Sequence, residues 1–238
     1  MHISVIDAAK ACAAMYAQNS VGSPGEIEGY TVTHYATGEI GFLVSSDTKG
    51  RPTYATYKKD GADAYIIAIR GSIDTESDWM SNNINISLNI TPARAKETFE
   101  FVVRQRFGRT ASEFVIAGHS LGGGLAQLVG YYTNNNFIAF NAPAMRNSLT
   151  GNLMIGSAGT GFKNETKSWN YSKGCVFNTS NDPISKLSGR FIGYDYEVFS
   201  RSAFGREAHS MAAVVEGLRG GRNYGSRSVL SCCSRARS

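Results

Sequence analysis

The chain has 238 residues, of which 42% are hydrophobic, and it carries a net charge of +5. This length allows one sizeable core, and we expect a single domain over residues 1–218. Four scattered cysteines are too few for a disulfide framework, and no spacing of cysteine and histidine is typical of a metal site. No apolar run approaches the length of a membrane-spanning helix.

The positive charge is concentrated at the end of the chain. Residues 219–238 contain five arginines and no acidic residue, so removing them from the +5 total leaves residues 1–218 neutral. We expect a basic, disordered tail that favours anionic partners such as a membrane surface. Cys232 and Cys233 in this tail are interpreted as ordinary residues, with acylation in a eukaryotic host as the alternative. Nucleic-acid binding is not favoured, because the neutral body contains no motif for it.

The beginning of the chain predicts a helix and no secretory signal. Apolar residues at helical spacing over residues 4–17 favour a packing helix. His2, Asp7 and Lys10 interrupt any apolar stretch there, so we expect a cytoplasmic protein or export without a cleaved signal. A loop over residues 20–29 and strands at about 41–45 and 53–58 follow.

The first strongly apolar strand covers residues 63–70 and ends in the polar turn Arg70-Gly71-Ser72-Ile73-Asp74. A continuous apolar strand of this kind is typical of a parallel sheet that is covered on both faces. Such sheets carry their sites at the carboxyl ends of the strands. We therefore expect functional residues in this turn.

Strands and helices alternate through the rest of the chain. We expect helices at 93–107, 121–132 and 208–218, strands at 114–117, 137–140, 173–179 and 194–200, and a surface loop or partial lid at 144–170. Each strand is followed by a polar turn, which indicates a mainly parallel sheet flanked by helices. The predicted fold class is therefore α/β.

One stretch indicates the chemistry: an apolar run leads into Gly118-His119-Ser120-Leu121-Gly122, and a helix-forming segment follows. This order predicts a nucleophile elbow, in which the serine lies on a sharp and strained strand-to-helix turn. Gly118 and Gly122 leave space for the tight crossing because they have no side chain. The alternative is an ordinary glycine-rich turn between a strand and a helix.

A serine nucleophile needs a general base, and only four histidines are present. His2 is terminal, His34 lies upstream, and we expect the side chain of His119 to leave the elbow in another direction. His209 alone fits the hydrolase order serine, aspartate, histidine. The alternative is that His209 is only a residue at the start of a helix.

The histidine in turn needs a carboxylate to orient it. Asp182 follows a buried strand and precedes Pro183, so we favour it over Asp195, which lies in an alternating and solvent-facing segment. Asp182 could instead only cap its own turn. For the oxyanion, we expect the backbone N–H of Leu121 and the backbone N–H and hydroxyl of Ser72 as donors.

These motifs resemble the class 3 lipase family, which comprises the fungal-type triacylglycerol lipases and their bacterial phospholipase relatives. The matching segments are Ile69-Arg70-Gly71-Ser72, Asp78-Trp79, Gly118-His119-Ser120-Leu121-Gly122-Gly123, Phe140-Asn141-Ala142-Pro143 and Asn181-Asp182-Pro183. The resemblance covers about residues 60–215. It implies an α/β-hydrolase fold and carboxylic ester hydrolysis, with Ser120, Asp182 and His209 as the triad and Ser72 and Leu121 in the oxyanion hole.

The resemblance and the basic tail together predict a phospholipase A1 or a lipase that needs no cofactor or metal. Apolar residues near the expected site that could meet acyl chains are Ile73, Met80, Ile84, Ile86 and Leu88, although these residues also suit an ordinary core. The alternative functions are a soluble short-chain esterase and a non-catalytic binding protein on a hydrolase fold. We expect a lipid substrate and peripheral membrane contact. The family also includes bacterial phospholipases delivered to other cells without a signal peptide, which agrees with a secreted effector.

Overall fold

A computed structural model describes residues 2–17, 23–36, 53–71, 92–107, 109, 113–146, 173–187, 189–201, 204–220 and 223–233. Its centre is a seven-stranded sheet whose strands lie side by side in sequence order. The strands are β1 (Tyr30–Ala36), β2 (Tyr54–Lys59), β3 (Ala64–Ile69), β4 (Glu113–His119), β5 (Asn136–Phe140), β6 (Gly174–Thr179) and β7 (Tyr194–Val198). Pairing is antiparallel from β1 to β3 and parallel from β3 to β7. The mostly parallel sheet expected from the sequence is therefore confirmed.

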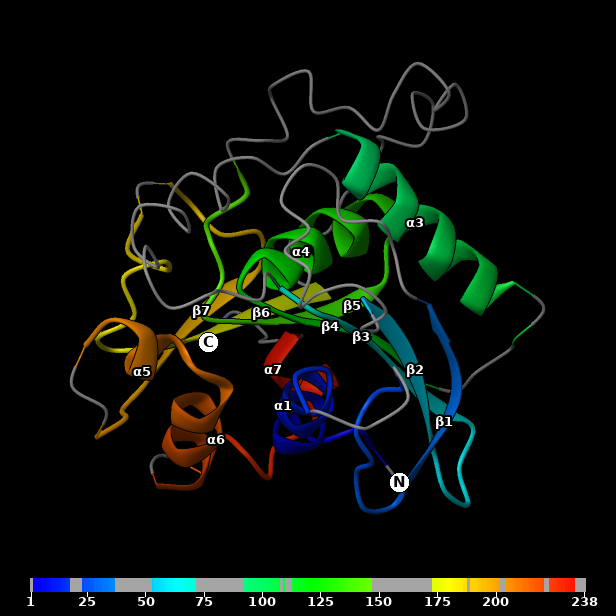
Figure 1. Ribbon diagram of the computed structural model, residues 1–238, viewed down its shortest axis with the longest axis horizontal. Coiled ribbons are helices and arrows are strands. Elements are labelled where there is room, and N and C mark those ends of the chain that lie inside the picture. Colours follow the sequence, from blue (N-terminus) through cyan, green and yellow to red (C-terminus); the bar gives the residue numbers. More distant parts are fainter. Residues whose placement is uncertain are drawn as a thin grey trace.

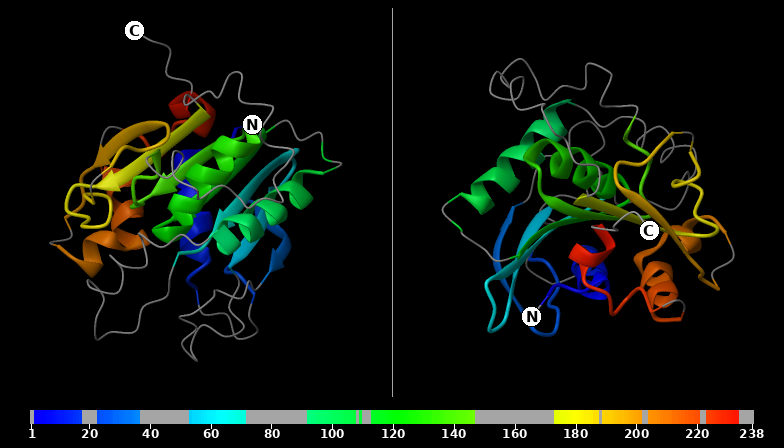
Figure 2. Two further views of the ribbon diagram at one scale, coloured as in Figure 1. Left: turned by 90° about the horizontal axis from the view of Figure 1, so that it is seen from above. Right: turned by 180° about the vertical axis from the view of Figure 1, so that it is seen from behind.

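Helices cover both faces of this sheet (Figure 1). One face carries α3 (Pro92–Arg106) and α4 (Leu121–Thr133), and the other carries α1 (Val5–Ala14), α6 (Met211–Gly220) and α7 (Val229–Cys233). The short helix α5 (Arg206–His209) precedes α6 near the end of β7. Each face has its own hydrophobic core, and the two views in Figure 2 show the same three layers. The structure is thus an α/β fold of three layers.

The central strands are buried on both sides, as their continuous apolar sequences predict. Every residue of β3 and of β4 is buried. Their side chains alternate between the two cores: Ile66 and Val115 belong to the α1 side, whereas Ile67 and Ile116 belong to the α4 side. This double burial explains why both strands read as unbroken apolar runs.

The strand β1 is not among the elements expected from the sequence. It lies at the edge of the sheet, and most of its residues are exposed or only partly buried. Thr31, Thr33 and His34 give it a polar sequence with little alternation. Its pairing with β2 depends on the backbone, which the hydrophobic pattern does not reveal. The strand expected at 41–45 lies outside the described residues.

The expected disorder of the tail is wrong for residues 223–233. The helix α7 packs under β5 and β6, and its residues Val229, Cys232 and Cys233 are almost completely buried. Tyr196 donates a hydrogen bond of 2.9 Å to the Cys232 carbonyl. The local sequence contains few apolar residues, but those few fill the α1 side of the core. Burial also makes Cys232 and Cys233 unsuitable as exposed acylation sites.

The helix α1 begins with a reciprocal cap. Ser4 accepts a hydrogen bond from the Asp7 backbone N–H, and the Asp7 carboxylate accepts one from the Ser4 backbone N–H. This arrangement satisfies two N–H groups that a helix start would otherwise leave unpaired. The helix ends at Ala14, and Tyr16 follows at the end that faces the carboxyl edge of the sheet. Within the described residues, no helix has the length and apolar character needed to cross a bilayer.

Candidate active site

The backbone of Ser120 has the strained conformation expected of a nucleophile elbow. Its φ is 56° and its ψ is −128°, and it stands between the last residue of β4 and the first residue of α4. A Cβ on Gly118 would lie 2.1 Å from the Gly122 carbonyl oxygen, and a Cβ on Gly122 would lie 2.3 Å from the Ile69 carbonyl oxygen. Only glycine fits at these two positions, so the Gly-x-Ser-x-Gly pattern follows from the close crossing of strand and helix.

A buried carboxylate holds the imidazole of His209. The Asp182 Oδ1 atom lies 2.7 Å from His209 Nδ1, and the Asp182 side chain is completely buried. Asp182 also accepts the backbone N–H groups of Ser185, at 2.8 Å to Oδ2, and of Ile184, at 3.2 Å to Oδ1. Burial alone would raise the pKa of Asp182, but the hydrogen bond and charge of His209, with the bonds from Ser185, lower it below its usual range. Asp182 is therefore ionised at neutral pH.

The alternative carboxylate, Asp195, is in a different environment. It is exposed on β7 and accepts a hydrogen bond of 3.1 Å from Asn178. The alternation expected for this strand is present, with Tyr196 and Val198 buried. The structure therefore brings Asp182, and not Asp195, to His209.

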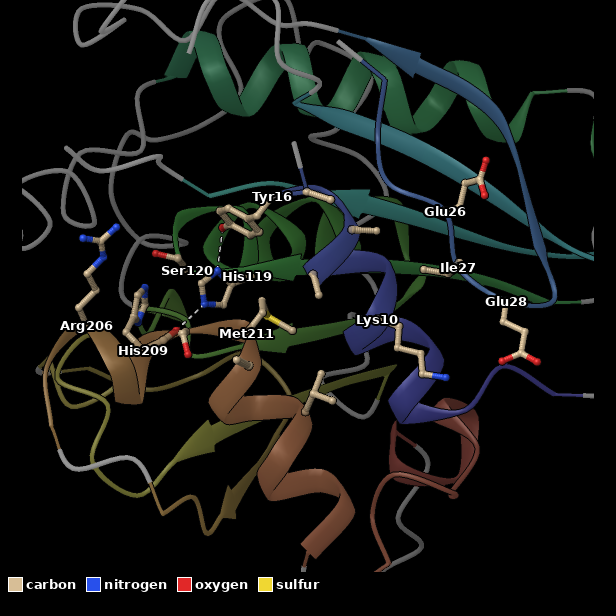
Figure 3. Close-up of a pocket in the computed structure, with 16 residues that line it drawn as sticks. Lys10, Tyr16, Glu26, Ile27, Glu28, His119, Ser120, Arg206, His209 and Met211 are labelled. Atoms are coloured by element: carbon tan, nitrogen blue, oxygen red, sulfur yellow. Dashed lines mark hydrogen bonds between the residues drawn. The ribbon is translucent and has the colours of Figure 1, made fainter. Parts of the chain in front are cut away.

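Ser120 and His209 line the same pocket, which has a volume of about 860 Å³ (Figure 3). Its walls come largely from α1 and α6, and it contains the apolar side chains of Ala13, Ala14, Ala17, Ile27, Met211, Ala212 and Val215. Arg206 lies beside His209 at one end, whereas Lys10 and Glu28 lie at the other (Figure 3). The pocket is thus a mainly apolar groove that leads to a hydroxyl and an imidazole.

Two residues of the site are missed by the sequence interpretation. His119 is 5% exposed, and its ring lies 4.8 Å from the ring of His209 between centroids. The Tyr16 hydroxyl lies 2.7 Å from His119 Nδ1, so the helix expected only to pack contributes to the site. Burial, and then the charge of His209, lower the pKa of His119 to about 3. The sequence separation of 103 residues leaves no local signal for this contact.

The oxyanion donors are described only in part. Leu121 is the first residue of α4, where backbone N–H groups and the helix dipole favour negative charge. Ser72 and the acyl-contacting candidates Ile73, Met80, Ile84, Ile86 and Leu88 lie outside the described residues. Gly71, directly before Ser72, does approach the elbow: a Cβ there would lie 2.8 Å from Ser120 Cβ. Most of the loop expected at 144–170 is also outside the described residues.

In the described segments, potential metal ligands do not cluster and the thiols are buried. No group of three histidine, cysteine or acidic side chains there is arranged to hold a metal ion. All four cysteines are free and buried. Burial raises the pKa of the Cys12 thiol, so it is protonated and unreactive at neutral pH.

Comparison with solved structures finds fungal lipases over most of the chain. A triacylglycerol lipase from Penicillium expansum is 16% identical, with 97% of this chain and 95% of that chain covered and a TM-score of 0.37. A mutant form of MDLA from Penicillium cyclopium has the same identity and coverage and a TM-score of 0.42. The Rhizomucor miehei lipase propeptide complex is 13% identical, with 86% and 71% covered and a TM-score of 0.38. No curated protein sequence matches.

A sequence-family model gives the assignment. The model of the Tle-like phospholipase domain, a phospholipase-like family, matches residues 10–171. The match begins within α1 and includes Tyr16 and the elbow, and it ends before Asp182 and His209. It covers more than half of the chain, and the family implies a hydrolase of lipid esters. The chain therefore belongs to the Tle-like phospholipase family.

Proposed function

We propose that the chain is a carboxylic ester hydrolase of lipids, a phospholipase A1 or lipase, that works through an acyl intermediate on Ser120. The observation that carries this proposal is the buried pair of Asp182 and His209, 2.7 Å apart, in the same pocket as a serine with φ of 56°. A strained serine, an oriented imidazole and an ionised carboxylate are the three parts that acyl transfer needs.

In the proposed mechanism, the Ser120 hydroxyl attacks the ester carbonyl while His209 Nε2 takes its proton. Asp182 stabilises the resulting imidazolium, because it accepts the Nδ1–H. The Leu121 N–H and Ser72 hold the oxyanion until His209 gives the proton to the leaving alcohol. Water then attacks the acyl-serine, His209 accepts a proton from it, and the fatty acid leaves as the Ser120 hydroxyl is restored.

The lining of the pocket supports a lipid substrate. Small apolar side chains on α1 and α6 leave a groove beside Ser120 that suits an acyl chain. Arg206 is exposed at the reactive end, where its charge would attract the phosphate of a phospholipid head group. This cation favours phospholipid over neutral glyceride.

Fatty acid release from three substrates tests the proposal: phosphatidylcholine vesicles, a triglyceride emulsion and a soluble short-chain ester. We expect release from phospholipid by the wild type and none by Ser120→Ala. Arg206→Ala should lower phospholipid hydrolysis more than glyceride hydrolysis, whereas the control Arg201→Ala, an exposed arginine outside the pocket lining, should lower neither. Cleavage of the soluble ester alone would replace the proposal with a simple esterase. No cleavage of any of the three would favour a binding protein.

A further inference from the structure

Residue 209 must be held in place by more than its carboxylate partner, because Asp182 orients the imidazole but does not fix the backbone that carries it. His209 ends the four-residue helix α5. The carbonyl before it, that of Ala208, accepts hydrogen bonds from Asn141 Nδ2 at 2.9 Å and Thr179 Oγ1 at 2.7 Å. These two bonds fix α5 to the ends of β5 and β6.

The carbonyl of His209 itself is held by His119. The Nε2 atom of His119 lies 2.7 Å from this oxygen. Figure 3 marks this hydrogen bond with a dashed line. A carbonyl oxygen can only accept, so Nε2 carries the hydrogen. Burial keeps the His119 imidazole neutral, with its pKa lowered to about 3, and Nδ1 is therefore an acceptor.

The remaining bonds follow from this tautomer. Tyr16 must donate its hydroxyl proton to His119 Nδ1, at 2.7 Å. The Tyr16 oxygen then accepts the backbone N–H of Gly71, at 3.0 Å. The hydrogen bonds run in one direction: from Gly71 to Tyr16, from Tyr16 to His119, and from His119 to the His209 carbonyl. Bonds aligned in this way polarise and strengthen one another.

We infer that Tyr16 and His119 are positioning residues, which together set the distance between His209, Ser120 and the end of β3. The inference rests on the proposed function of Ser120 and His209. Each end of the chain of hydrogen bonds meets one part of the catalytic apparatus: Gly71 directly precedes Ser72, and the His209 carbonyl belongs to the proposed base. His119 itself is bonded to the neighbouring Ser120 through the backbone. Removing Tyr16 or His119 from this series of hydrogen bonds should therefore loosen Gly71, Ser120 and His209 together.

Tyr16→Phe tests this inference with the smallest change, since it removes only the hydroxyl. We expect kcat on a soluble ester to fall about tenfold with KM within twofold, because the site remains but the reacting atoms are held less closely. The matched control is Tyr57→Phe, which likewise removes one tyrosine hydroxyl; this hydroxyl is buried and donates to the Gly25 carbonyl at 3.0 Å. The control should lose similar thermal stability and keep kcat within twofold.

A pair of substitutions at His119, in the middle of this series of hydrogen bonds, gives a second measurement. His119→Leu should lower kcat about 100-fold, whereas the amide of His119→Gln can donate to the His209 carbonyl and should recover most of that loss. Titration with a fluorophosphonate corrects each kcat for the fraction of active protein. Wild-type kcat in Tyr16→Phe, an equal loss in Tyr57→Phe, or no recovery in His119→Gln compared with His119→Leu would overturn the inference.

These outcomes are separate from a failure of the proposed function. If the wild type cleaves no ester, or if Ser120→Ala remains active, the catalytic proposal fails. If wild-type activity depends on Ser120 but Tyr16→Phe is unaffected, only the positioning role is wrong. Should His119→Leu fail to fold, Tyr16→Phe and its control still decide the question.

Discussion

The hydrogen bonds around Asp182 predict what its replacement by asparagine will do. The carboxylate accepts His209 Nδ1–H at 2.7 Å and the Ser185 N–H at 2.8 Å, with a longer bond of 3.2 Å from Ile184. An amide has only one oxygen. We expect that oxygen to face the fixed backbone N–H of Ser185, so that the NH₂ group turns toward His209. His209 would then be protonated on Nε2, the atom that accepts the proton of Ser120 in the proposed mechanism.

The magnitude follows from two costs. Loss of a charge-assisted hydrogen bond costs about 2–3 kcal/mol. To restore the correct tautomer of His209, the amide would have to turn round so that its NH₂ group faces the Ser185 N–H. Two donors would then face each other, and leaving this buried group unpaired costs about another 2 kcal/mol. With 1.36 kcal/mol for each factor of ten, the kcat of Asp182→Asn should fall roughly 10³- to 10⁴-fold.

The assay is hydrolysis of a soluble short-chain ester, with thermal unfolding as a check on folding. Asp195→Asn is the matched control, because it changes the exposed carboxylate that competes with Asp182 in the sequence, and it should keep kcat within twofold. The reasoning would be refuted if a folded Asp182→Asn protein kept more than a tenth of wild-type kcat, or if Asp195→Asn lost activity to the same extent.

Three other expectations concern folding and pH. Gly118→Ala should lower the free energy of unfolding by about 1–3 kcal/mol or more and kcat about 100-fold, because the added Cβ would lie 2.1 Å from a carbonyl oxygen. Unchanged activity would contradict the tight crossing of strand and helix. Burial lowers the pKa of His119 from its ordinary value of 6.5 to about 3 in the folded protein. The unfolded chain therefore takes up the proton first, and the free energy of unfolding falls by about 1.4 kcal/mol per pH unit as the pH drops from 6.5 to 3. Urea unfolding at several pH values should show that the free energy of unfolding depends less on pH in His119→Gln than in the wild type. An equal slope would contradict the assignment of this pH dependence to His119. Val229→Ala should lower the free energy of unfolding by about 2 kcal/mol, because this side chain is fully buried, whereas a disordered tail would give no change.

Local patterns predict the parts of this protein that depend on neighbouring residues. The elbow depends on two glycines within four residues of each other, and the buried strands β3 and β4 depend on continuous apolar runs. Asp182 and His209 can be chosen as candidates because strand ends and chain order limit the choices. These features need no knowledge of tertiary contacts.

The missed features all depend on contacts between distant segments. The contact of Tyr16 with His119 spans 103 residues, and α1 by its own sequence is only an apolar helix with a cap. The tail looks disordered because its few apolar residues are separated by glycine, serine and arginine. Its order comes from the sheet face that Val229 covers. The composition of a short helix does not show which surface of the protein it packs against.

The most direct test of the account is the site of covalent modification by a fluorophosphonate. Intact-mass measurement followed by peptide mapping should find one adduct per chain, on Ser120 and nowhere else. Labelling should be absent in Ser120→Ala and strongly slowed in His209→Ala. An adduct on another residue, or equal labelling of Ser120→Ala, would contradict the claim that this strained serine is the nucleophile.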